Sequence, residues 1–226
     1  KTVIRECLIG REKLLSGFGK IARSKKAEPE HFAISLIGEP TLYPHIGEMI
    51  FELRRLGKTT FLVTNGLNPS LIKKMAKKKQ LPTQLYVSLN TPNKEMYDKW
   101  HNNKEKGSWK KFNHTLDLTK KLKSKTRTVI RMTLVKNMNM EKEQVEEYVE
   151  LIKKASPDFL EIKGYKSVGF ARKRKGMGYE AMPTHKEVKY YAKLISKATK
   201  YQFVDDFKPS CVVLLKRDDS VKRFIS

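Results

Sequence analysis

The sequence has 226 residues and carries 48 Lys and Arg against 24 Asp and Glu, a formal net charge of +24. Its hydrophobic fraction of 39% and charged fraction of 32% fit a soluble globular protein and exclude a membrane-embedded or a disordered one. One domain is expected at this length. A charge this large attracts polyanions over long range, so nucleic acid is the first partner to consider, with a lysine-rich proteome as the alternative explanation.

The start of the sequence indicates the cellular compartment of the protein, and its cysteines and histidines indicate whether it binds a metal. No apolar stretch near Lys1 resembles a secretory signal, so we expect a cytoplasmic protein without a membrane partner. The sequence begins without Met and enters an amphipathic pattern at once, so we expect a fragment whose natural start lies upstream. The two cysteines, Cys7 and Cys211, are too far apart for a metal knuckle, and the five histidines show no metal spacing. We therefore expect no metal site in this chain.

Short runs of β-branched and aromatic residues alternate with segments of helical period, which is typical of βα units that form a parallel sheet. A helix is predicted first, over residues 1–17. Strands are then predicted over residues 31–37, 59–64, 84–89, 127–135 and 158–163. Two of the intervening helices show one apolar face each, formed by Ile46, Met49, Ile50 and Leu53 in the first and by Val145, Tyr148, Val149 and Ile152 in the second.

The remainder of the chain is less regular. Residues 165–183 form a Gly-rich basic loop, a helix is predicted after Thr184, and residues 211–215 are predicted as a last strand. Repeated right-handed βαβ crossovers curl a sheet towards a barrel, with the active site at the carboxyl ends of the strands. The sequence therefore predicts an α/β fold, with a partial barrel over residues 1–183 and a C-terminal helix and strand packed on it over residues 184–226.

Polar residues and glycines follow the predicted strands. They are Gly38-Glu39-Pro40-Thr41, Asn65-Gly66, Ser88-Leu89-Asn90, Lys136-Asn137 and Lys163-Gly164. Gly38 lets a ligand approach the backbone closely, and the Glu39 carboxylate can accept hydrogen bonds from a substrate ammonium. The alternative is an ordinary βα turn in which Pro40 starts a helix, because short motifs often match by chance.

Several stretches, in order along the chain, resemble one enzyme family. They are SLIGEPTLYP at 35–44, TFLVTNG at 60–66, LPTQLYVSL at 81–89, TRTVIRMTLVK at 126–136, PDFLEIK at 157–163, VGFAR at 168–172 and MPTH at 182–185. Together they resemble the tRNA wybutosine-synthesising radical S-adenosylmethionine (SAM) family, 4-demethylwyosine synthase, in its shorter archaeal form. The resemblance covers nearly the whole chain.

That resemblance implies a partial (βα)6 radical SAM barrel that lacks its first strand and cluster loop. It also implies a lyase in which SAM is cleaved reductively at a [4Fe-4S] cluster. The radical takes hydrogen from the methyl group of N1-methylguanosine at position 37 of tRNA(Phe), and pyruvate supplies two carbons of 4-demethylwyosine. The implied partners are tRNA(Phe), pyruvate and an electron donor such as a flavodoxin or ferredoxin, and we expect a monomer.

The resemblance further implies a SAM site at the rim, by which we mean the edge of the sheet formed by the carboxyl ends of the parallel strands. Gly38, Glu39 and Pro40 match the turn that holds the methionine amino group. The other members of the implied site are Ser35, Thr64, Asn65, Ser88, Asn90 and Arg131. Arg131 suits a carboxylate, although a residue that flanks the core and pairs with a helix acid is the alternative.

Two lysines are the catalytic candidates. Lys136 and Lys163 end strands at the rim, where a lysine can meet phosphate, SAM or the pyruvate carboxylate. A solvated lysine is the alternative for each, and Schiff-base chemistry is not assigned to either. The family also uses a lysine upstream of this segment.

A basic loop is the candidate tRNA contact. Arg172, Lys173, Arg174 and Lys175 lie in a Gly-flanked loop at the rim, which suits tRNA phosphates. Phe170 and Tyr179 are candidates for stacking on an extruded base, or for anchoring the loop in the core.

The cluster ligands are the missing part of the family pattern. Radical SAM chemistry needs three Cys thiolates, normally spaced Cys-x3-Cys-x2-Cys after the first strand, and neither Cys7 nor Cys211 stands in such a pattern. We expect the cluster cysteines upstream of Lys1 and expect the chain alone to be inactive. The alternatives are a radical SAM enzyme with another substrate and a non-catalytic tRNA-binding fragment.

Overall fold

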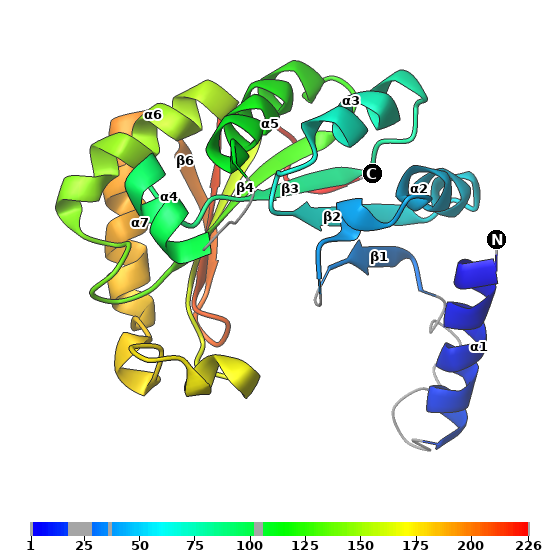
Figure 1. The fold of residues 1–226 in the computed structure, drawn as a ribbon, viewed down its shortest axis with the longest axis horizontal. Helices are drawn as coiled ribbons and strands as arrows, with labels where there is room; N and C mark the ends of the chain where they lie inside the picture. The colour runs from blue at the N-terminus through cyan, green and yellow to red at the C-terminus, as the bar shows by residue number, and fades with distance from the viewer. Residues whose placement is uncertain (1, 18–28, 36–37, 102–105, 226) are drawn as a thin grey trace.

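The structure is a computed structural model that describes residues 2–17, 29–35, 38–101 and 106–225. These residues form one sheet in the order β1-β2-β3-β4-β5-β7-β6 (Figure 1). The parallel part stands in chain order and consists of β1 (His31–Ile34), β2 (Thr59–Thr64), β3 (Gln84–Ser88), β4 (Arg127–Leu134) and β5 (Phe159–Gly164). β7 (Val212–Lys216) is antiparallel to β5, and β6 (Gln202–Phe207) is antiparallel to β7. The predicted α/β class with mostly parallel strands is confirmed.

Helices connect the strands. They are α1 (Thr2–Gly17), α2 (Ile46–Arg55), α3 (Pro69–Lys77), α4 (Lys94–His101), α5 (Ser108–Leu122), α6 (Val145–Ala155) and α7 (His185–Thr199). Figure 1 shows α2 to α7 along one side of the curved sheet, and α1 lies near the β1 end of the sheet, where it contacts α2. Within the described ranges, no helix combines the length and the apolar composition needed to cross a bilayer.

Local sequence signals fix where the helices begin. The Asn68 side chain accepts a hydrogen bond from the backbone N–H of Leu71, and Pro69 occupies the first turn of α3. Thr184 and Glu187 form a capping box at the start of α7, in which each side chain bonds the other's backbone N–H. These caps satisfy N–H groups that would otherwise lack a partner at the helix start.

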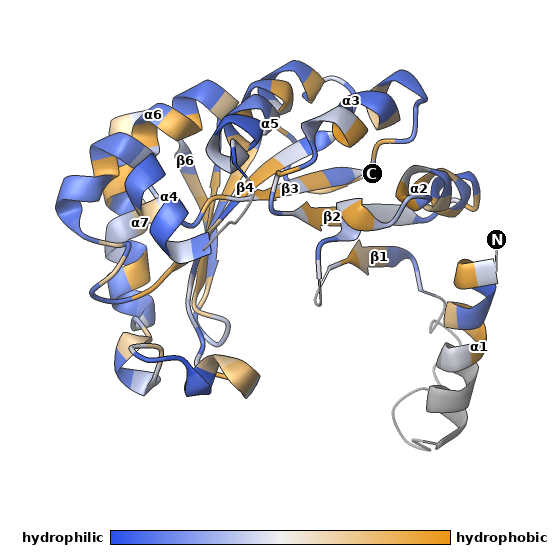
Figure 2. Cartoon of the chain, viewed as in Figure 1, coloured by the Kyte–Doolittle hydropathy of each residue, from blue (hydrophilic) through white to orange (hydrophobic). Residues whose placement is uncertain are grey.

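The two faces of the sheet differ in burial. Burial alternates along β2 and along the second halves of β4 and β5, and buried residues such as Leu62, Ile130 and Ile162 join the core formed with the helices. Figure 2 shows hydrophobic residues along the strands and hydrophilic residues on the outer sides of the helices. The half-buried residues between them form the open face of the sheet, which we define as Val63, Tyr86, Ser88, Arg131, Thr133, Glu161 and Lys163.

Three segments differ from the sequence predictions. The strand predicted over 31–37 is described as β1 up to Ile34, and residues 36–37 lie outside the described residues. The loop over 165–183 contains two short 3-10 turns, η3 (Gly169–Lys173) and η4 (Tyr179–Ala181). β6 was not predicted, because it is an edge strand whose residues are mostly exposed and whose pairing shifts register between Phe203 and Asp205.

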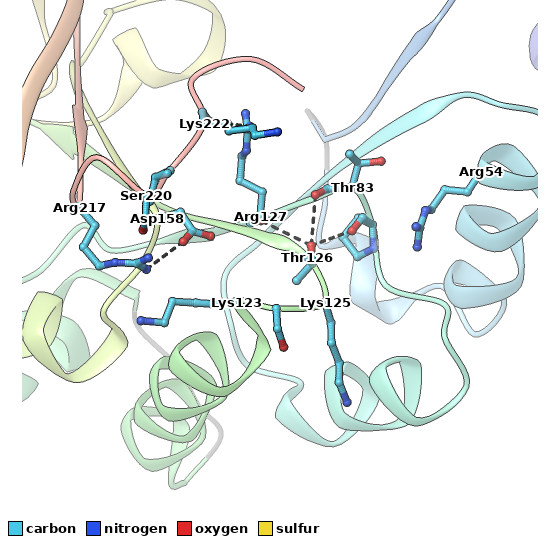
Figure 3. A pocket seen from close by; sticks show the side chains of 13 residues that line it. Arg54, Thr83, Lys123, Lys125, Thr126, Arg127, Asp158, Arg217, Ser220 and Lys222 are labelled. Atoms are coloured by element: carbon cyan, nitrogen blue, oxygen red, sulfur yellow. Dashed lines mark hydrogen bonds and ion pairs between the residues drawn. The ribbon is translucent and has the colours of Figure 1, made fainter. Parts of the chain in front are cut away.

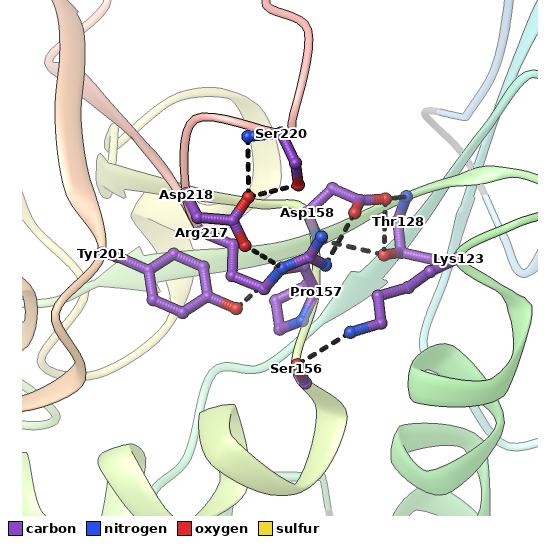
Figure 4. A network of polar contacts seen from close by, with 9 residues as sticks. All are labelled: Lys123, Thr128, Ser156, Pro157, Asp158, Tyr201, Arg217, Asp218 and Ser220. Carbon is purple, nitrogen blue, oxygen red and sulfur yellow. Dashed lines mark hydrogen bonds and ion pairs between the residues drawn. The ribbon is translucent and has the colours of Figure 1, made fainter.

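A carboxylate network joins β4, β5 and β7 at the ends where β4 and β5 begin (Figure 4). Asp158 Oδ2 accepts hydrogen bonds from the backbone N–H and the hydroxyl of Thr128, at 2.9 and 3.1 Å. Its other oxygen lies 2.9 Å from Nη1 of Arg217, the residue that follows β7. The Tyr201 hydroxyl donates to the Pro157 carbonyl oxygen at 2.6 Å in the same network. The C-terminal strands are thus held to the parallel part by buried polar bonds as well as by the sheet.

Replacing Asp158 with Ala is expected to lower the free energy of unfolding by about 3 kcal/mol, because Arg217 and Thr128 lose their common partner in a site where the Asp158 side chain is only 10% exposed. Urea denaturation measures the loss. Asp219→Ala is the matched control, since that carboxylate is 83% exposed and its ion pair with Lys216 is solvated. Equal losses in both variants would contradict this account.

Candidate cofactor-binding rim

The Glu39 carboxylate organises the turn after β1. Oε1 accepts hydrogen bonds from the Thr41 N–H at 3.0 Å, the Thr41 hydroxyl at 2.6 Å and the Thr64 hydroxyl at 2.7 Å. Oε2 accepts one from the Asn65 backbone N–H at 2.7 Å. Four donors from two segments of the chain therefore meet on one side chain. In this structure the carboxylate holds the turn to the end of β2.

The neighbouring residues of the turn surround the hydrogen-bonded Glu39 carboxylate. Gly38 has φ +78°, a conformation that favours glycine, and a Cβ placed there would meet no atom within 4 Å. Pro40 opens the short 3-10 turn η1 (Pro40–Leu42), for which Glu39 is the N-cap. Ser35 is exposed at the end of β1. Thr64 is 1% exposed, so it supports Glu39 from the buried side and does not line a cavity.

A row of polar side chains crosses the open face beside this turn. Strand register places Ser88 next to Arg131 and Arg131 next to Glu161. Arg131 Nε donates to Glu161 Oε1 at 2.8 Å, and its guanidinium lies 4.8 Å from the centre of the Tyr86 ring. Burial and the Glu161 charge raise the pKa of Tyr86. Arg131 thus pairs with an acid on a neighbouring strand, and its terminal nitrogens make no hydrogen bond to another described residue.

Asn90 and Asn139 lock the ends of β3 and β4 together. Asn90 Oδ1 accepts a hydrogen bond from the Thr133 N–H at 3.2 Å. The amide nitrogen of Asn139, a fully buried residue, donates to the carbonyls of Asn90 and Thr133 at 2.7 and 2.8 Å. Sequence reasoning missed Asn139, because nothing near it in the sequence marks a buried asparagine.

The two candidate lysines have different surroundings. Lys136 Nζ lies 2.7 Å from Glu187 Oε1, in the first turn of α7, so it pairs with an acid of the chain itself. This contact is the largest cause of a lowered Glu187 pKa, about 2, followed by the Thr184 N–H of the capping box. Lys163 lies on the open face, next to Thr133 in the neighbouring strand, and has no carboxylate partner among the described residues.

The basic loop presents aromatic rings to solvent. Phe170 is 84% exposed and Tyr179 is 67% exposed, so neither ring anchors the loop in the core. The Lys173 ammonium lies 5.7 Å from the Phe170 ring centre, and the Arg172 guanidinium lies 5.7 Å from that of Tyr179. Arg174 and Lys175 follow in the exposed segment after η3.

The two cysteines lie far from any metal-binding arrangement. Cys7 is exposed on α1. Cys211 is 2% exposed, and burial raises its pKa. It packs so closely on Gly164 that a Cβ there would come within 2.8 Å of its sulfur. The described residues contain no group of three or more His, Cys, Asp or Glu that could hold a metal ion.

Comparison with known proteins identifies the fold and its sequence family. Residues 18–152 match the Radical SAM superfamily, and residues 154–217 match the wyosine base formation family. The chain belongs to the radical SAM superfamily. The resemblance inferred from the sequence is thereby confirmed, and membership implies SAM and an iron–sulfur cluster as cofactors.

Relatives of this radical SAM chain cover nearly all of it. It is 40% identical over 224 residues to the S-adenosyl-L-methionine-dependent tRNA 4-demethylwyosine synthase of Pyrococcus abyssi. The matched region covers 96% of the chain and 64% of that protein. The enzyme of the same name from Methanocaldococcus jannaschii is 36% identical, with 95% of the chain and 65% of that protein covered. A solved structure of TYW1 with a lysine–pyruvate adduct bound has a TM-score of 0.76 at 33% identity, over 94% of this chain and 65% of that one. The chain therefore spans less than two thirds of the length of these relatives.

The rim fits one of the two implied cofactors. An exposed glycine backbone at Gly38, held by Glu39 and flanked by polar side chains of the open face, suits the amino-acid end of SAM. The described residues do not fit the cluster, because its thiolate ligands are not found among them.

Glu39→Gln is expected to lower the free energy of unfolding by about 1 to 3 kcal/mol, because the amide NH2 must face a backbone or hydroxyl donor whichever oxygen it replaces. Urea denaturation checks this. Glu48→Gln on α2, where the side chain is exposed, serves as control and should change little. The interpretation is wrong if the two variants lose the same stability.

Lys136→Gln is expected to shift the acid limb of the stability profile. The contacts that lower the Glu187 pKa from its ordinary value of 4.5 stabilise the fold fully at pH values above 4.5. This stabilisation is lost as the pH falls from 4.5 towards about 2. Without Lys136 the Glu187 pKa rises towards 4.5, so the loss of stability below pH 4.5 should be smaller and should level off at a higher pH. Urea midpoints between pH 2 and 6 measure this, with Lys153→Gln as the control for an exposed pair. A profile identical to that of the wild type would contradict the assignment.

Proposed function

We propose that the protein containing this chain forms 4-demethylwyosine from N1-methylguanosine at position 37 of tRNA(Phe) and pyruvate. The observation that carries this proposal is the 40% identity to the Pyrococcus abyssi synthase over nearly the whole chain, together with a wyosine base formation segment that shares one sheet with the radical SAM segment. The reaction class is that of a carbon–carbon lyase. Its setting is the cytoplasm, the enzyme is a monomer, and a flavodoxin or ferredoxin supplies electrons.

The proposed SAM site is built from the rim. The backbone around Gly38 and Glu39 holds the amino group of SAM, with Pro40 fixing the turn. The side chains around the cofactor are Ser88 and Arg131 of the open face, together with Ser35, Asn65 and Asn90, which follow the ends of β1, β2 and β3. Thr64 acts through Glu39. With the [4Fe-4S] cluster, whose ligands we place outside these residues, SAM supplies a radical that removes hydrogen from the methyl group.

Lys163 is the stronger of the two lysine candidates. Lys163 lies on the open face beside Thr133, two residues further along the strands than the Arg131–Glu161 pair. Lys136, in contrast, is paired with Glu187. Pyruvate is an anion, and two cations on one face suit its carboxylate. One solved relative contains a lysine–pyruvate adduct. In this chain we assign Lys163 the binding of the carboxylate, which involves no covalent step.

The reaction is tested with the reconstituted full-length protein, tRNA(Phe) containing N1-methylguanosine, pyruvate, SAM and a reductant. Mass spectrometry of the digested tRNA should show the tricyclic nucleoside. SAM cleavage without this product would favour a radical SAM enzyme with another substrate. Tight tRNA binding without SAM cleavage would favour a non-catalytic tRNA-binding protein.

Lys163→Ala is expected to lower product formation by about 10- to 100-fold at limiting pyruvate, because a charge-assisted hydrogen bond is lost. Lys136→Ala is the matched control and should leave the rate within about twofold, since its partner is Glu187. High pyruvate should partly restore the rate of Lys163→Ala. A larger effect at Lys136 than at Lys163 would reverse the assignment.

Phe170→Ala and Tyr179→Ala are each expected to weaken tRNA binding, by about 1 to 3 kcal/mol if the ring stacks on a base. Both rings are exposed, so thermal stability should be unchanged. Phe207→Ala on β6, where the ring is 57% exposed, controls for the loss of a surface aromatic. Fluorescence anisotropy with labelled tRNA measures affinity, and equal affinities for all three variants would exclude the loop as a base contact.

A further inference from the structure

A second basic surface lies at the opposite end of the sheet from Glu39. A cavity of about 570 Å³ opens where the parallel strands begin, with Thr83 just before β3, Arg127 at the start of β4 and Asp158 just before β5 (Figure 3). We call it the strand-start pocket. β4 has eight residues and spans about 25 Å, so the pocket is separate from the rim.

The lining of the strand-start pocket is strongly cationic. Its charged side chains are Arg54, Lys123, Lys125, Arg127, Arg217 and Lys222, against the single carboxylate of Asp158. That carboxylate is already bound by Arg217 and Thr128. The lining therefore carries a net charge of +5, of which the neighbouring Asp218, 2.8 Å from Arg217 Nε, balances one.

Neutral groups hold several of these cations without cancelling their charge. Arg127 donates to the backbone carbonyls of Lys222, Arg223 and Phe224 at 2.8 to 3.1 Å. Arg54 donates to the Leu81 carbonyl at 2.9 Å. Such bonds fix the direction of each guanidinium and leave its positive charge available to an anion.

The lysines of the pocket are less constrained. Lys123 Nζ bonds the Ser156 hydroxyl at 3.0 Å, and burial together with the nearby Arg217 lowers its pKa. Lys125 and Lys222 are exposed and have no carboxylate partner among the described residues. Figure 3 places these two lysines on opposite sides of Arg127. The cations are thus spread along the pocket and do not converge on one point.

This spread favours a polyanion over a small oxyanion. The lining residues include Thr83 and Ser124, whose hydroxyls can donate to phosphate oxygens, but no aromatic ring on which a base would stack. A ligand held by charge and hydroxyl groups alone is recognised through its backbone. An RNA strand supplies phosphates in series, so it can contact cations that are spread along the pocket.

We propose that the strand-start pocket binds the phosphate backbone of RNA, as a sequence-independent contact separate from the reacting rim. The choice of RNA over other polyanions rests on the proposed function. The contact itself requires neither the methylated base nor SAM.

The test is RNA binding by the purified 226-residue chain, with an RNA hairpin that lacks the methylated guanosine. Fluorescence anisotropy is followed at several salt concentrations. The double variant Lys125→Gln, Lys222→Gln should bind more weakly, and the slope of log affinity against log salt should be shallower by about 1.4 to 1.8. Lys193→Gln with Lys197→Gln removes the same charge from exposed positions of α7 and should leave the slope unchanged.

Equal slopes for the two double variants would overturn the proposal, as would a wild-type chain that does not bind the hairpin. Phosphorus NMR with inorganic phosphate provides a second arm. Line broadening that disappears in Lys125→Gln, Lys222→Gln while the RNA slope stays unchanged would reassign the pocket to a small oxyanion. Because the hairpin cannot react, failure here leaves the proposed reaction standing, and failure of the product assay leaves this contact standing.

Discussion

The rim depends on one carboxylate that faces inward. Glu39 collects hydrogen bonds from Thr41, Thr64 and Asn65, and so ties the turn after β1 to the end of β2, where backbone pairing between the two strands has already stopped. A turn fixed in this way presents the backbone around Gly38 in one conformation before any ligand arrives. Preorganisation of this kind reduces the entropic cost of binding.

The positions of the parallel strands and of α2 and α6 could be predicted from the sequence, because periodic burial governs both. The spacing of Ile46, Ile50 and Leu53, and of Tyr148 and Ile152, reflects helix faces that pack on a sheet. β6 could not be predicted in this way. Within the described sheet its one neighbour is β7, and a strand with one partner and mostly exposed side chains leaves no periodic apolar signal.

Candidate site residues could be located on the rim, but their partners could not be read from the sequence. Lys136 and Lys163 both end strands, and only the tertiary structure shows that one pairs with Glu187 while the other lies on the open face. The pairing of Arg131 with Glu161 depends in the same way on the register between β4 and β5. The total charge of +24 indicated a polyanion but carried no information on where the cations gather.

The junction between the two family segments falls inside α6, which runs without interruption from Val145 to Ala155. β4 belongs to the first segment and β5 to the second, yet they are paired over six residues. The two segments therefore share one sheet and one hydrophobic core. A chimera made by exchanging everything after residue 153 would have to preserve both the helix face and the interface between the two strands, so functional recombination at this point demands a closely related donor.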